Sequence, residues 1–163
     1  MFPNFKEQIT IGDLQLNFVL DGDDTDSTLV VFEMIVPPNA KVPAPHYHVD
    51  ETLYIMEGRL TQIYGTQTLE LKKGDKLFIK RGTVHGFNNK GPETVKALCM
   101  LSPASIGPAY FREIAAVLNG GGPPDMQKIL DIMQRHGLEA GNIDNLTTSG
   151  TLAERGGEPR VEA

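Results

Sequence analysis

The stretch Pro43-Ala-Pro-His46-Tyr-His48-Val-Asp-Glu51-Thr-Leu-Tyr-Ile-Met-Glu-Gly58 determines how the rest of this sequence is interpreted. On an extended strand successive side chains alternate between faces, so His46 and His48 point the same way. Glu51 follows after two residues, a gap long enough for a tight turn, so a second strand would bring its carboxylate beside the two imidazoles. The stretch therefore predicts three metal-competent groups on one interior.

A second stretch supplies a further histidine. It reads Gly74-Asp-Lys-Leu-Phe-Ile-Lys-Arg-Gly82-Thr-Val-His85-Gly-Phe-Asn-Asn89, and His85 begins a predicted strand after a glycine-marked turn. Three neutral imidazoles and one carboxylate suit a divalent transition metal such as Fe, Mn, Ni, Zn or Cu, and they leave coordination positions open for a ligand.

Together the two stretches resemble the paired motifs of the cupin superfamily. The first matches H-x-H followed by Glu, six residues and Gly; the second matches G-x-x-H-x-x-x-N after an upstream glycine. The resemblance is to the small single-domain cupins that include quercetin-dioxygenase-like proteins. It implies a jelly-roll barrel, the double-stranded β-helix, with a metal held inside by His46, His48, Glu51 and His85. Glu51 is also the candidate catalytic group, as a proton acceptor.

The sequence departs from the family pattern in two places. Lys80 stands where the family usually has proline, and only two residues separate His48 from Glu51 where the family usually has three or four. A shortened loop would keep all four ligands. A register slip by two would instead put Ala44 and His46 in the first two ligand places and leave a three-ligand or metal-free site. We favour the shortened loop.

Composition excludes several classes of function. The chain has 163 residues and a formal net charge of −6, with no basic run, which opposes nucleic-acid binding. Its one cysteine, Cys99, permits no internal disulfide and favours a reducing compartment. The sequence contains no run of 18 apolar residues that would cross a membrane, and it starts with neither a basic nor an apolar segment. We expect a soluble, cytoplasmic protein.

Short apolar and β-branched segments, separated by turn residues at intervals of about eight to twelve residues, indicate an all-β sandwich or barrel over residues 1–102. Beyond Pro103 the apolar period becomes helical. Helices are expected over 108–119 and 125–136, the second with an apolar stripe of Met126, Ile129, Leu130 and Met133. We expect residues 103–138 to be a helical extension packed on the barrel or on a partner, and 139–163 to be a polar tail.

Two functions follow as hypotheses. The first is a metal-dependent oxygenase or isomerase acting on a small enolisable or aromatic compound. The second is a non-catalytic cupin that binds a small ligand, with or without metal. In both we expect a small-molecule ligand and a homodimer, with neither nucleic acid nor membrane as a partner.

Overall fold

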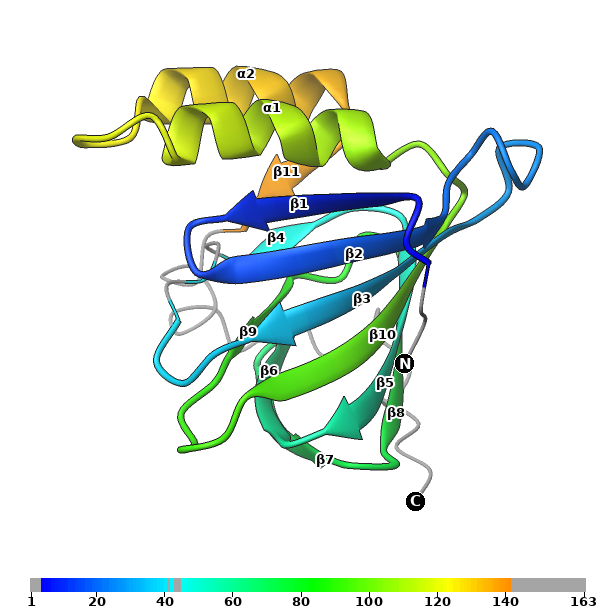
Figure 1. The fold of residues 1–163 in the computed structure, drawn as a ribbon, viewed down its shortest axis with the longest axis vertical. Helices are drawn as coiled ribbons and strands as arrows, with labels where there is room; N and C mark the ends of the chain where they lie inside the picture. The colour runs from blue at the N-terminus through cyan, green and yellow to red at the C-terminus, as the bar shows by residue number, and fades with distance from the viewer. Residues whose placement is uncertain (1–3, 41, 43–44, 142–163) are drawn as a thin grey trace.

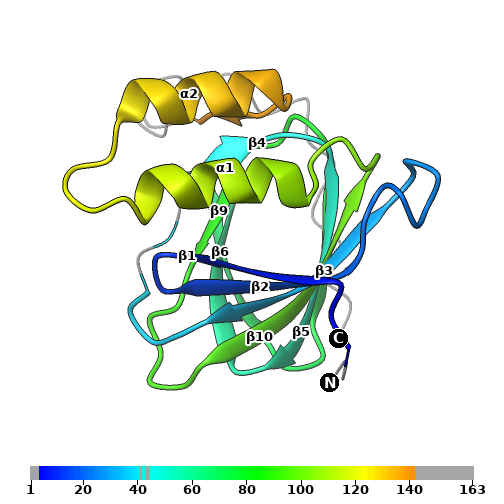
Figure 2. The same cartoon turned by 45° about the horizontal axis from the view of Figure 1, so that its top comes forward.

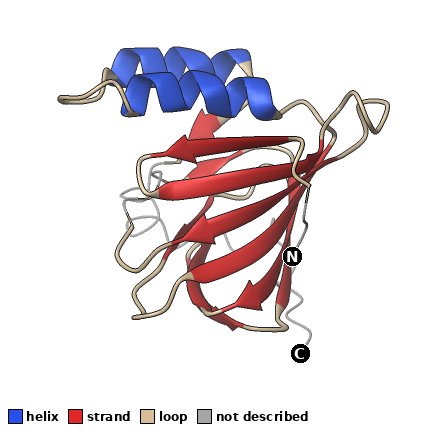
Figure 3. Cartoon of the chain, in the orientation of Figure 1, coloured by secondary structure: helices blue, strands red, loops and turns tan. Residues whose placement is uncertain are grey.

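A computed structural model describes residues 4–40, 42 and 45–141, and these form two antiparallel β-sheets with two helices along one side (Figures 1 and 3). The six-stranded sheet has the order β1-β2-β3-β10-β5-β8, and the five-stranded sheet has the order β11-β4-β9-β6-β7. This is the jelly-roll barrel with C-terminal helices that the sequence predicts. The strands are β1 (Glu7–Ile11), β2 (Leu14–Leu20), β3 (Val30–Val36), β4 (His46–Tyr47), β5 (Asp50–Glu57), β6 (Arg59–Tyr64), β7 (Gln67–Lys72), β8 (Lys76–Ile79), β9 (His85–Asn88), β10 (Val95–Ser102) and β11 (Glu139–Ala140).

The hydrophobic core lies between the two sheets because the inward residues of each strand alternate with outward ones. In β10 every second residue from Val95 to Leu101 is buried, and β5 contributes Leu53 and Ile55 to the same interior. From the facing sheet, Leu60 and Leu71 are paired across β6 and β7 and are both buried. This period-two pattern is the reason that the strands could be recognised from the sequence.

Gly58 allows the chain to pass from β5 in one sheet to β6 in the other. Its φ is +79°, and a Cβ at this position would lie 2.8 Å from the carbonyl oxygen of Thr94. Only glycine adopts this backbone conformation readily and also permits so close an approach. The connection at Gly58 joins the two sheets next to Thr94.

Two helices close the side of the barrel where the edge strands β1 and β11 lie (Figure 2). α1 (Pro108–Leu118) packs against β1, and α2 (Met126–Arg135) packs against α1 and β11. The ring of Phe111 in α1 lies 5.6 Å from the rings of both Phe18 and Phe32. The helical extension therefore extends the barrel core. Within the part of the chain that the structure describes, neither helix has the length and apolar character needed to cross a bilayer.

The apolar stripe predicted for α2 is only partly right. Ile129 and Met133 pack against the core, but Met126 and Leu130 are 59% and 42% exposed, and the buried residue is Ile132. The buried face of α2 depends on the positions of α1 and β11, which both pack against it, and a periodicity argument does not specify these positions. Residues 139–141 of the predicted polar tail carry β11, and its remainder, 142–163, lies outside the described residues.

Candidate metal centre

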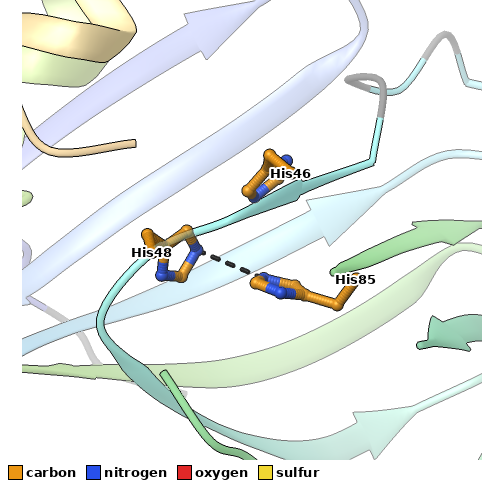
Figure 4. Close-up of side chains that lie close together, drawn as sticks. All are labelled: His46, His48 and His85. Atoms are coloured by element: carbon orange, nitrogen blue, oxygen red, sulfur yellow. Dashed lines mark hydrogen bonds between the residues drawn. The ribbon is translucent and has the colours of Figure 1, made fainter. Parts of the chain in front are cut away.

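The four predicted ligands come from segments of both sheets. His46 is in β4 and His48 directly follows that strand, His85 begins β9, and Glu51 is in β5 of the opposite sheet. His46 and His85 are register partners in the β4–β9 pair, so their side chains leave the same face of the sheet. Figure 4 shows the three imidazoles close together, with His46 and His48 on one segment and His85 on another.

The three imidazoles are close enough to share one ion, and Glu51 lies beside two of them. The three histidines each offer a nitrogen, and these nitrogens lie within 4.8 Å of one another. The Oε2 atom of Glu51 lies 3.0 Å from Nε2 of His85 and 3.3 Å from Nε2 of His48, and the two Nε2 atoms are 3.2 Å apart. The side chains of His48 and His85 are each 4% exposed and that of Glu51 is 13% exposed.

The outward nitrogens of two imidazoles fix their tautomers. Nδ1 of His48 lies 3.0 Å from the carbonyl oxygen of Val49, and Nδ1 of His85 lies 2.9 Å from that of Thr83. A carbonyl oxygen can only accept, so both Nδ1 atoms must carry a proton. In the neutral rings the two Nε2 atoms are therefore bare, and together with the Glu51 carboxylate they place three lone-pair atoms in contact.

Such a cluster needs a cation at its centre. A proton can serve, with one imidazole charged, and so can a metal ion. The carbonyl-oriented imidazoles are the arrangement in which histidine usually binds a metal, because the outer hydrogen bond holds the ring and raises the basicity of the inner nitrogen. The donor set of nitrogen and carboxylate oxygen thus fits a divalent transition metal.

The charges within the cluster reinforce this fit. Burial pushes the pKa of Glu51 upward, but the hydrogen bonds that Glu51 accepts when the inner nitrogens of His48 and His85 carry a proton outweigh burial, so the pKa lies well below its ordinary range. Burial pushes the pKa of His85 down, but the hydrogen bond with Glu51 outweighs it and the pKa is raised. Glu51 is therefore a permanent anion near neutral pH, and it favours a cation beside it.

A clamp on the short turn explains why two residues suffice between His48 and Glu51. The Asp50 carboxylate accepts from the backbone N–H of Arg81 at 2.7 Å and from its guanidinium at 2.7 Å. The N–H of Gly82 donates to the carbonyl oxygen of His48 at 3.1 Å. The β8–β9 loop thus holds the turn, and His46 and His48 lie in one cluster, as a shortened loop requires.

The segment after α2 holds the other side of β4. In β11, Ala140 is the register partner of His46 and Glu139 that of Tyr47, whose hydroxyl donates to the Glu139 carboxylate. The N–H of Gly141 donates to the carbonyl oxygen of Pro45 at 2.8 Å. This pairing could not be predicted from the sequence, because a two-residue strand has no period to detect. The strand that carries His46 is consequently secured by the C-terminal extension.

Other interior residues near the cluster were not predicted as part of the site. Tyr64 of β6 is the register partner of His85, so it faces the same interior, and Gln62 is the next inward residue. Cys99 is 1% exposed on β10. Burial, and secondarily the charge of Glu51, raises the pKa of the Cys99 thiol well above its ordinary value. In the absence of a metal ion, the thiol therefore stays protonated near neutral pH.

Comparison with known proteins places this architecture in context. The Cupin domain family model matches residues 32–101. An uncharacterised protein of Methanocaldococcus jannaschii is 38% identical over 72 residues, which are 44% of this chain and 58% of that relative. The chain thus spans somewhat more than half the length of that relative.

Solved structures share the fold. A polyketide cyclase from Streptomyces resistomycificus is 25% identical with a TM-score of 0.52, over 59% of this chain and 72% of that one. A predicted oxalate decarboxylase from Thermotoga maritima is 20% identical with a TM-score of 0.54, over 60% of this chain and 90% of that one. A cupin-like protein from Thermotoga maritima is 18% identical with a TM-score of 0.52, over 64% and 79%.

Proposed function

This chain belongs to the cupin superfamily, and we propose that it binds one divalent transition metal ion through His46, His48, Glu51 and His85 and uses it to bind and transform a small enolisable or aromatic compound. The reaction class that we propose is oxygenation or isomerisation. Such an ion supplies Lewis-acid polarisation of a ligand oxygen, and redox chemistry with dioxygen if it is iron or copper.

The observation that carries this proposal is the contact of three lone-pair atoms at the centre of the cluster. The Nδ1 protons of His48 and His85 are committed to backbone carbonyl oxygens, so the inner atoms have no proton of their own to share in the neutral state. A mainly structural histidine pair would place a donor opposite an acceptor. Here the arrangement needs either an added proton or a metal ion, and the donor set suits the metal ion.

The chain's own residues supply the rest of the site. The carbonyl oxygens of Val49 and Thr83 orient the rings, and the Asp50–Arg81 pair holds the turn between two ligands. Leu53, Leu77 and Cys99 lie side by side across β5, β8 and β10, and all three are buried. This apolar wall excludes water and favours a flat, weakly polar compound.

One observation favours the second function, a non-catalytic binding protein. Glu51 is the carboxylate in contact with His48 and His85, and the proposal assigns it to the metal. Catalysis would then depend on the metal or on Glu51 leaving it. The non-catalytic alternative is the same protein without turnover.

Metal analysis tests the proposal first. Protein purified without added metal, and then reconstituted with Fe²⁺, Mn²⁺, Ni²⁺, Zn²⁺ or Cu²⁺, should hold close to one ion per chain. His48→Ala should lose it. His136→Ala should keep it, because His136 lies on the helical extension with Glu113 as its partner. Equal metal content in the two variants would refute the ligand set.

Oxygen uptake then separates the two functions. The metal-loaded protein is offered flavonols, catechols and β-diketones, with product analysis for isomers. Turnover that disappears in His48→Ala supports the enzyme. Binding of these compounds without any turnover supports the non-catalytic alternative and refutes the enzyme.

A further inference from the structure

Gln62 in the middle of β6 carries a buried side-chain amide whose oxygen has no hydrogen-bond partner among the described residues. The residue is 0% exposed, and its Nε2 donates to the carbonyl oxygen of Ile63 at 3.1 Å. Its Oε1 is buried and has no hydrogen-bond partner within the described part of the chain. Buried amide oxygens are nearly always paired, so this one requires an explanation.

The orientation of the amide is not arbitrary. Exchanging the nitrogen and the oxygen would place Oε1 against the carbonyl oxygen of Ile63, and two acceptors would then face each other. The Ile63 carbonyl therefore fixes the nitrogen on its side. Oε1 is the atom left for another partner.

The sheet register places the side chain of Gln62 on the inner face of the barrel. Tyr64 is the partner of His85, whose ring belongs to the metal cluster, so Tyr64 and every second residue before it face the interior. Gln62 is therefore one row further along, about 6.6 Å from Tyr64 in the strand direction. It lies between the histidine row and the fully buried pair Leu60 and Leu71.

Apolar groups surround Gln62 in its own row. Its register partners are Phe87 of β9 and Leu69 of β7, and both pack against the hydrophobic core. These side chains offer no donor for Oε1. A neutral acceptor in apolar surroundings selects a neutral donor, because a charged group would lose its hydration without an opposite charge to replace it.

We propose that Gln62 is a specificity-determining residue whose Oε1 accepts a hydrogen bond from a hydroxyl group of the compound bound at the metal centre. The inference rests on the proposed function and narrows it. The ligand is a small enolic or phenolic compound that binds the metal through oxygen and carries a further hydroxyl directed along the barrel toward β6. Compounds in which that hydroxyl is absent or methylated bind more weakly.

Three probes that differ at one position test the proposal on the full-length, Ni²⁺-loaded protein. They are catechol, pyrogallol, which adds one hydroxyl, and 3-methoxycatechol, in which that hydroxyl is blocked. Affinities are measured by calorimetry for wild type, Gln62→Met and Gln8→Met. Methionine has a similar length and no strong acceptor, and Gln8 is an exposed glutamine on β1 that serves as the control.

We expect wild type and Gln8→Met to prefer pyrogallol over 3-methoxycatechol by about tenfold, the value of one hydrogen bond to a buried acceptor. In Gln62→Met the preference should fall to within about twofold, with the catechol affinity unchanged. An equal preference in all three proteins overturns the inference. Failure of all three probes to bind a protein that holds nickel also overturns it and leaves metal binding intact.

Two further measurements separate this role from a structural one and from failure of the proposed function. Chemical denaturation should show Gln62→Met to be at least as stable as wild type, because the substitution removes an unpaired acceptor. A marked loss of stability would mean that Oε1 is paired within the folded chain, and would overturn the inference. Absence of nickel from wild-type protein would overturn the proposed function and this inference with it.

Discussion

Nickel should stabilise the folded chain by an amount that shrinks as the pH falls, and removing the His85 imidazole should abolish that stabilisation. The physical basis is that a proton and a metal ion compete for the same lone pair, on Nε2 of His85. This nitrogen lies 3.0 Å from Oε2 of Glu51. The perturbations are a change from about pH 7.5 to about pH 5.5 and the substitution His85→Ala.

The size of the effect follows from linkage. At a nickel concentration about 100 times the Kd at pH 7.5, binding adds about 2.7 kcal/mol to the free energy of unfolding. The pKa of His85 is raised above 6.5, so protonation of this residue alone weakens binding by at least about tenfold at pH 5.5. The same nickel concentration then adds at most about 1.4 kcal/mol. Every further imidazole that binds the ion lowers this figure.

In the metal-free protein the contribution of His85 to the free energy of unfolding should change with pH in the direction opposite to the nickel contribution. Because the pKa of His85 is raised in the folded state, the His85–Glu51 pair contributes its full stability below about pH 6.5 and loses it as the pH rises through the raised pKa. The difference in free energy of unfolding between the metal-loaded and the metal-free protein therefore increases toward alkaline pH.

Differential scanning calorimetry of untagged protein measures both effects. For a chain of this length about 2.7 kcal/mol corresponds to a rise in Tm of about 5–11 °C, and about 1.4 kcal/mol to about 3–6 °C. His136→Ala is the matched control, since His136 also has a glutamate partner, Glu113, at 2.9 Å. A nickel shift that is equal at both pH values, or that survives in His85→Ala, would refute the reasoning.

Two glycine substitutions test the scaffold around the centre. In Gly141→Ala the new Cβ would lie 2.6 Å from Cγ1 of Val84, so β11 should move away from β4. Nickel affinity, measured by calorimetry, should then fall about tenfold. Unchanged affinity would show that β11 does not position the strand that carries His46. Gly58→Ala should lower the free energy of unfolding by about 1–3 kcal/mol more than Gly12→Ala in urea denaturation. Both glycines have positive φ, but nothing lies within 4 Å of a Cβ at Gly12, so equal losses would contradict the close approach to Thr94.

Local patterns in the sequence were enough to predict strands β1 to β10, the two helices and the convergence of the three histidines. Alternation in β10 and the H-x-H spacing of β4 are properties of neighbouring residues, and a strand turns such spacing directly into faces. The same logic failed on α2. There the buried face depends on where α1 lies, and Ile132 is buried while Met126 is exposed.

The sequence by itself determined which residues are available to hold an ion, because residue type and strand spacing decide what can ligate and which face it leaves. Only the tertiary structure decided how the ligands are aimed. The contracted turn depends on Arg81 binding Asp50 across 31 residues, and the strand of His46 depends on β11, which arrives after both helices. The tertiary structure also decided that Oε1 of Gln62 has no hydrogen-bond partner among the described residues. Whether a polar atom is hydrogen-bonded depends on which groups the fold brings within about 3 Å, and the local sequence pattern does not specify this.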